Sequence, residues 1–227
     1  MEHAVVECEE RASLAVALDP RLGRLVAAVA SFETRAKPHH RRTLRQLHAG
    51  KLERNMADAE LKAADACIDD HFLWILHPEQ RPSLEWFLDM SEVAVARHRA
   101  RIIQVDPWNR LEAARGQNES ETKYIGRCLR TLHTFAHDMN CHVQVIAHPS
   151  KMDATRKGKA PELEDISGSK NWDNMVDQGF VVHRPKFFED GERQTEAEFL
   201  HRKAHDDSSQ ISEAASLAGC SRCRAYA

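Results

Sequence analysis

Three side chains that could act on a phosphate ester each follow an apolar run of strand length. The runs are 25–32, 102–105 and 143–147, and the residues that follow them are Glu33, Asp106 and His148. A carboxylate in such a place can orient and deprotonate an attacking water. A second carboxylate can hold a magnesium-bound water beside phosphates, and an imidazole can donate to a terminal phosphate.

Each of these residues also has a plainer interpretation. Glu33 can be a solvent-facing glutamate at a strand end, and Asp106 can be an aspartate in a turn. His148 can be a surface histidine, since the chain has 14 histidines, and Pro149 after it favours a sharp exit into a loop. The three residues gain weight only if the fold brings them together.

The elements predicted between these residues indicate a fold that brings the three residues together. Further strands are predicted at 72–76, 180–182 and 197–200. Helices are predicted at 38–48 and 57–68, after the capping residue Ser83, and from Asn118. Asn118 and Glu121 together resemble a capping box. Strand and helix alternating with short joins predict an α/β fold, with a mainly parallel sheet covered by helices on both faces. In such sheets ligands bind beyond the carboxyl ends of the strands, so the three residues are expected at one edge.

The last of these helices has the clearest periodicity. Its apolar face is predicted to consist of Ile125, Cys128, Leu129, Leu132, Phe135 and Met139. This spacing places all six side chains on one stripe, which should lie against the sheet.

The composition is that of an ordinary soluble globular protein. Charged residues make up 30% of the chain and hydrophobic residues 42%, and the net charge of −3 restricts any nucleic-acid contact to a local basic patch. The six cysteines are scattered, which indicates a reducing compartment and no disulfide framework. No run approaches a membrane span and residues 1–30 lack a signal-length apolar core, so a cytoplasmic location is predicted.

Two other patterns concern binding. The polar loop 149–166 carries Lys151, Arg156, Lys157 and Lys159. Such cations can bind backbone phosphates with release of counterions, although a charged loop can also be simply solvated. Cys220 and Cys223 have the spacing of half a zinc knuckle, but no matching pair lies nearby, and we interpret them as incidental.

A longer string gives these residues a family context. It runs Asp165-Ile-Ser-Gly-Ser-Lys-Asn-Trp-Asp-Asn-Met-Val-Asp-Gln-Gly-Phe-Val-Val-His-Arg184, and it follows Asp-Pro-Trp-Asn at 106–109 and Ala-His-Pro-Ser-Lys at 147–151. In this order the three strings resemble the RecA-like motor domain of the DnaB-type replicative helicases, in particular the phage primase–helicase and Twinkle-like branch, in which a histidine replaces a glutamine sensor. The resemblance covers roughly residues 25–205.

The resemblance implies a role for each matching residue. Glu33 would be the catalytic base, Asp106 the magnesium-side carboxylate of the Walker B strand, and His148 the phosphate sensor. Lys151, Arg156, Lys157 and Lys159 would grip single-stranded DNA, and Arg184 would lie near the base or ribose of the nucleotide. The implied ligands are ATP, or another NTP, with Mg²⁺, and the implied assembly is a hexameric ring that can meet primase or other replication proteins.

Two parts of the family pattern are missing. The family has a loop Gly-x-x-x-x-Gly-Lys-Ser/Thr before the strand that ends at Glu33. In this chain only Gly50 and Gly158 precede a lysine, and Arg45 and Asp153 stand where the other glycine is needed. The residues 7–13, Glu-Cys-Glu-Glu-Arg-Ala-Ser, are largely acidic and cannot form a glycine-dependent nest for phosphates.

The second missing part lies near the other end of the chain. The family has Lys-x-Arg near its last strand, where the arginine reaches the nucleotide of the neighbouring subunit. Here the matching string is Lys203-Ala-His205, with Arg202 as a possible substitute. Loss of such an arginine can cost ~10³–10⁵ in rate in related phosphoryl-transfer systems.

These observations lead to an expected organisation and two functional hypotheses. We expect a degenerate or truncated segment 1–24, a RecA-like motor domain 25–207 whose first phosphate-binding unit is incomplete, and an irregular tail 208–227. The first hypothesis is an ATP-dependent DNA helicase domain that translocates on single-stranded DNA and unwinds duplex DNA, with impaired hydrolysis. The alternative is a non-catalytic RecA-like remnant that binds DNA or acts as a scaffold. A metallohydrolase is disfavoured, because only the number of histidines supports it.

Overall fold

The computed structural model of this chain describes residues 24–33, 39–76, 82–111, 115–149, 159–166, 170–183 and 198–204. The described residues form two compact units. The first contains β1 to β4, α2 to α4 and the end of α5, and the second contains the start of α5 and everything from η5 to β6. The elements are β1 Ala27–Ser31, α2 Arg41–Ala49, η2 Glu53–Asn55, α3 Asp58–His71, β2 Phe72–Trp74, α4 Leu84–His98, β3 Ile102–Asp106, η3 Trp108–Arg110, α5 Glu121–Asp138, β4 His142–Val145, η5 Leu163–Asp165, α6 Lys170–Met175, β5 Gln178–His183 and β6 Glu198–Ala204.

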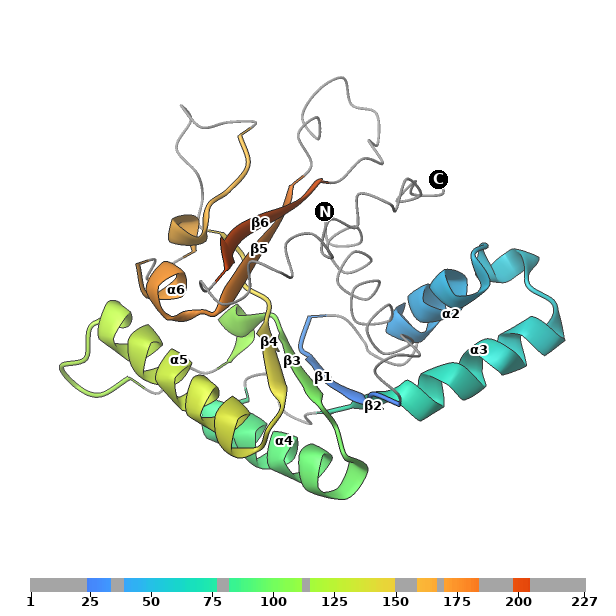
Figure 1. The fold of residues 1–227 in the computed structure, drawn as a ribbon, viewed down its shortest axis with the longest axis horizontal. Coiled ribbons are helices and arrows are strands. Elements are labelled where there is room, and N and C mark those ends of the chain that lie inside the picture. The colour runs from blue at the N-terminus through green and yellow to red at the C-terminus, as the bar shows by residue number, and fades with distance from the viewer. Residues whose placement is uncertain are drawn as a thin grey trace. The chain divides into compact units, whose positions relative to one another are not determined.

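The first unit is built on the predicted parallel sheet. Its four strands are all parallel and lie in the order β2-β1-β3-β4. The chain moves from β1 to β2 in one direction and from β2 through β3 to β4 in the other. With right-handed crossovers this reversal puts α2 and α3 on one face and α4 on the other, and Figure 1 shows α2 and α3 side by side, with α4 across the sheet. The prediction of a parallel sheet with helices on both faces is confirmed.

The two central strands form the core of this unit. All five residues of β3 are buried, as are the first four of β1. Such near-continuous burial is typical of a strand covered by helices on both faces. On the α2–α3 side, Leu44 and Ile68 are fully buried against β1 and β2.

The ends of α4 and α5 show how local sequence sets the boundaries. Ser83 caps α4 as predicted, because its side chain accepts a hydrogen bond from the backbone N–H of Trp86. The predicted capping box of Asn118 and Glu121 is wrong. Helix α5 begins at Glu121, and Ser120 is the residue that accepts from the N–H of Lys123, at 3.4 Å.

The predicted apolar face of α5 is confirmed where the helix is most enclosed. Ile125, Cys128, Leu129 and Leu132 are buried, and Phe135 is half-buried. Met139, which follows the last helical residue, is also half-buried.

Within the described residues, no helix is long and apolar enough to cross a bilayer.

The second unit contains the two later strands that the sequence predicts. They are β5 and β6, which pair antiparallel in a separate two-stranded sheet. Gly179, in β5, faces the side chain of Leu163, and a β-carbon at this position would collide with a Leu163 methyl group. This close approach gives a packing reason for one glycine of the 165–184 string.

A network of charged residues joins α2 to α3. Asp65 of α3 accepts from the Arg45 Nε at 2.7 Å and from the Arg41 Nη1 at 2.9 Å. Arg41 also pairs with Asp69, and Arg45 with Glu53 at 3.5 Å. The Arg45 guanidinium, followed by that of Arg41, holds the pKa of the Asp65 carboxyl below its ordinary value, although burial acts in the opposite direction.

We predict that Asp65→Asn destabilises the protein by about 1 kcal/mol at pH 7, because one carboxylate holds two arginines. A carboxyl group with a lowered folded-state pKa stabilises above its unfolded pKa of about 4 and loses that contribution as the pH falls further. Urea unfolding at several pH values should therefore show the variant and the wild type converging below about pH 4. Asp89→Asn, on the exposed side of α4, is the control and should behave like the wild type. A difference that is unchanged at low pH would contradict the prediction.

Candidate functional site

The carboxyl ends of β1 and β3 bring the first two candidate residues together. Ser31 and Asp106 are register partners in the parallel pair, and the N–H of Phe32 donates to the carbonyl oxygen of Asp106 at 2.8 Å. Glu33 follows directly. The chain progresses in opposite directions from β1 and β3, so this is the point in the sheet where ligands are expected to bind.

Glu33 is held by two cationic or potentially cationic side chains. Its Oε1 lies 3.0 Å from the Nε of Arg110, and its Oε2 lies 3.5 Å from the Nε2 of His148. The Glu33 side chain is 23% exposed, so solvent still reaches it. The backbone N–H of His148 in turn donates to the side-chain oxygen of Asn109, at 3.4 Å. The predicted meeting of Glu33 with His148 is therefore present, and Arg110 is an addition.

Asp106 has a different environment. It is buried, and burial is the largest effect on its carboxyl group, raising its pKa. His40 and then His148 act in the opposite direction, and the negative charge of Glu33 adds to the increase. Because a nearby cation would offset the cost of burying this carboxylate, the site fits an ion such as Mg²⁺, which takes oxygen ligands.

His40 belongs to the same site, although no motif or spacing in the sequence points to it. It is 2% exposed, its Nε2 lies 2.8 Å from the Ser31 Oγ, and its ring stacks on Trp74 with centroids 5.6 Å apart. Burial lowers the pKa of His40, and the charge of Asp106 acts in the opposite direction. His40 therefore contacts the side chain that lies beside Asp106 in the sheet.

Three of the remaining candidate residues, Lys159, Arg202 and Lys203, lie in the described part of the chain. Lys159 is exposed, and the Nε of Arg202 lies 3.2 Å from Glu162, so Arg202 already has a carboxylate partner. The structure describes the backbone of Lys203 but not its side chain. Lys151, Arg156, Lys157 and Arg184 lie outside the described residues, as do segment 1–23 and the two C-terminal cysteines. In the described part of the chain, no three His, Cys, Asp or Glu side chains form a group that could hold a metal.

Comparisons with known proteins place this geometry in context. No protein-family model matches the chain. The chain is 31% identical over 166 residues to the "Twinkle homolog protein, chloroplastic/mitochondrial" of Arabidopsis thaliana, an alignment that covers 69% of this chain and 23% of that protein. The chain therefore spans less than a quarter of the length of this relative.

Solved structures agree with the fold. One, described as an ATPase domain, superposes with a TM-score of 0.68 at 17% identity, covering 88% of this chain and 73% of the other. A DnaB-like replicative helicase, studied with its interactions with primase, superposes with a TM-score of 0.62 at 21% identity, covering 80% of this chain and 46% of the other. The fold is that of RecA-like ATPase domains.

We predict that the burial of His40 makes stability pH-dependent. A histidine whose folded-state pKa is lowered must lose its proton to fold, so stability falls on acidification from about pH 6.5 down to the folded-state pKa. For one proton the slope reaches at most about 1.4 kcal/mol per pH unit. His40→Gln can still bond Ser31 but cannot titrate, and should flatten this dependence in urea unfolding. His48→Gln, at an exposed position of α2, is the control, and equal slopes in wild type and His40→Gln would contradict the prediction.

Proposed function

We propose that this chain, as a RecA-like motor domain of the DnaB-type replicative helicases, contributes hydrolytic residues to an NTP site. Hydrolysis at this site would drive movement on single-stranded DNA. One observation carries the proposal. Glu33, Asp106 and His148 come from three parallel strands and meet at one edge, where Glu33 lies 3.5 Å from His148. The family relationship is the reason to propose a nucleotide as the ligand at this edge.

The environments of the two carboxyl groups suit different tasks. Glu33 is partly exposed and can accept a proton from an attacking water once its contacts with Arg110 and His148 loosen. Asp106 is buried and would hold Mg²⁺ through a water molecule. When bound, Mg²⁺ supplies neutralisation of charge on the phosphates. His148, at the solvent side of Glu33, can donate to a terminal phosphate.

Further residues outside this edge are proposed to contact the nucleotide. Arg202 would have to exchange Glu162 for a phosphate in order to contribute, and Arg184 and Lys203 remain proposed nucleotide contacts. The proposed partners are single-stranded DNA, further copies of the chain in a hexameric ring, and primase or other replication proteins. The cytoplasmic location also stays a proposal, since the Arabidopsis relative is named as chloroplastic or mitochondrial.

A second function is favoured by a specific observation. The sequence has no glycine-rich loop to hold the triphosphate, and none of its nine glycines forms that motif. Without such a loop, binding of NTP by this chain would be weak and turnover impaired. The alternative is a RecA-like module that binds DNA or joins other subunits without hydrolysis.

The first test is Glu33→Gln, measured by steady-state hydrolysis of ATP with Mg²⁺, with and without single-stranded DNA. If Glu33 is the base, this substitution should reduce DNA-stimulated turnover by about 10²–10⁴-fold and leave ATP affinity within a few-fold. Glu85→Gln, on the exposed side of α4, is the matched control and should not change turnover.

Each outcome of this test decides between the two functions. DNA-stimulated turnover that depends on Glu33 would rule out the non-catalytic alternative. Absence of ATP binding at millimolar concentration would rule out an active motor and favour the scaffold.

The second test concerns the loop 149–166. Replacing Lys151, Lys157 and Lys159 by Ala should weaken binding of single-stranded DNA and lower the salt dependence by roughly 0.7 per lost phosphate contact, about two in total. Fluorescence anisotropy across a KCl series measures both quantities. Lys62→Ala, at an exposed position of α3, is the control. An unchanged salt slope would remove the loop from the DNA site.

A further inference from the structure

The amino end of the sheet carries a cluster of cations at the end opposite the candidate nucleotide site. We define the 97–101 patch as Arg97, His98, Arg99 and Arg101, which end α4 and lead into β3. β3 has five residues, so its two ends are four steps apart, a distance of roughly 13 Å at about 3.3 Å per step. A ligand bound at this patch would therefore leave Glu33 and Asp106 accessible.

The backbone under the patch is well anchored. The N–H of Arg101 donates to the carbonyl oxygen of Val26 at 2.8 Å, and the N–H of His142 donates to the carbonyl oxygen of Arg101 at 2.8 Å. The Arg101 Nη1 also donates to the carbonyl oxygen of Asn140 at 2.7 Å, which ties the end of α5 to the start of β3. The patch is thus fixed to the sheet at both neighbouring strands.

Arg99 occupies a backbone conformation that its side chain does not favour. It follows α4 with φ 57° and ψ 34°, in the left-handed region, and its N–H caps the carbonyl oxygens of Ala94 and Val95. Glycine or asparagine is usual at this position, and the chain uses Gly50 and Asn140 in the left-handed region after α2 and α5. The fold alone gives no reason for an arginine here, and an unfavourable conformation of this kind points to a role for the side chain.

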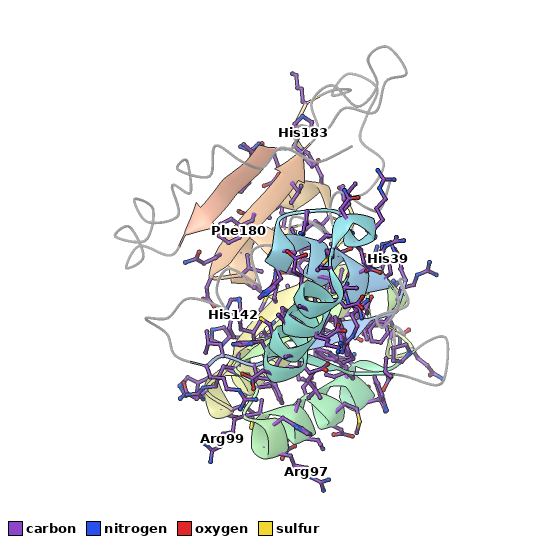
Figure 2. All side chains as sticks on the ribbon, turned by 90° about the vertical axis from the view of Figure 1, so that its right-hand side faces the viewer. His39, Arg97, Arg99, His142, Phe180 and His183 are labelled. Atoms are coloured by element: carbon purple, nitrogen blue, oxygen red, sulfur yellow. The ribbon has the colours of Figure 1, made fainter. Side chains whose placement is uncertain are left out.

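The charge of the patch is not neutralised within the part of the chain that the structure describes. Arg97 and Arg99 are exposed and make no ion pair there, which is also true of Arg42 and Arg54, whereas Arg24, Arg41, Arg45 and Arg110 of the same unit each meet a carboxylate. Figure 2 shows both side chains pointing outward from the end of α4. No acidic residue occurs between Glu92 and Arg101. The helix dipole accounts for Arg97 and His98 in the last turn, but it does not account for Arg99 beyond that turn.

We infer that the 97–101 patch is a second polyanion-binding surface, whose ligand is the phosphate backbone of nucleic acid. Guanidinium groups pair with phosphates through two parallel hydrogen bonds, and the anchored backbone at Arg101 fixes where the patch lies on the surface. The surface contains no residue of the loop 149–166 and is proposed to bind without nucleotide. It makes no base contact, so it binds irrespective of sequence.

The test uses the double variant Arg97→Gln/Arg99→Gly of the full chain and a fluorescein-labelled oligothymidylate, without nucleotide, across a KCl series. We expect affinity at low salt to fall by on the order of tenfold and the salt slope to drop by roughly one to two, one step for each lost phosphate contact. Arg42→Gln, an exposed arginine of α2, is the matched control. Arg99→Gly should at the same time raise the melting temperature by about 2–4 °C, because glycine tolerates the left-handed conformation.

A loss of binding in a more stable protein separates the proposed role from a folding defect. An unchanged salt slope, an equal effect of Arg42→Gln, or no binding of the oligonucleotide by the wild type would each overturn the inference. Polyglutamate that competes as well as unlabelled oligothymidylate would assign the patch to an acidic protein instead. Because no ATP is present, these results are independent of whether the chain hydrolyses nucleotide.

Discussion

The parallel pairing of β1 with β3 is the constraint on which the rest of the first unit depends. Five residues of each strand pair in register, ending with Ser31 opposite Asp106. A shift by one residue would turn every side chain of a strand to the other face, and Asp106 would no longer lie beside Ser31. Burial of both strands specifies this register, because a shifted strand would repack its side chains on both faces of the sheet.

The same pairing brings two carboxylates, Glu33 and Asp106, to one edge of the sheet but into different environments. Glu33 leaves the sheet and meets Arg110 and His148 at the solvent boundary, whereas Asp106 stays buried on its strand. Both carboxylates have histidines nearby. His40 and His148 act electrostatically on Asp106, and the Nε2 of His148 lies 3.5 Å from Glu33. Pairs of titratable groups with contrasting surroundings are a common feature of sites that divide base and electrostatic roles.

Much of this arrangement could be predicted from sequence, because it follows from local patterns. Apolar runs identified the strands, and residues that follow parallel strands share an edge, so Glu33, Asp106 and His148 could be grouped in advance. His40 could not be, since its contact with Ser31 and its stacking on Trp74 depend on how α2 packs against the sheet. Arg110 lies on a short turn after β3, and nothing in its neighbourhood marks Glu33, far away in sequence, as its partner. The local sequence does not determine the start of α5, because Asn118 and Ser120 near Glu121 could each cap the helix.

The contacts around Glu33 explain how the three candidate residues are held at the edge of the sheet. Arg110 and His148 hold Glu33 through side chains of the same unit, and the position of Asp106 is fixed by the register of its strand. The folding of the sheet therefore brings these side chains to one edge. The meeting of these three residues therefore follows from the fold, and hydrolysis at this edge would further require a group that binds the phosphates.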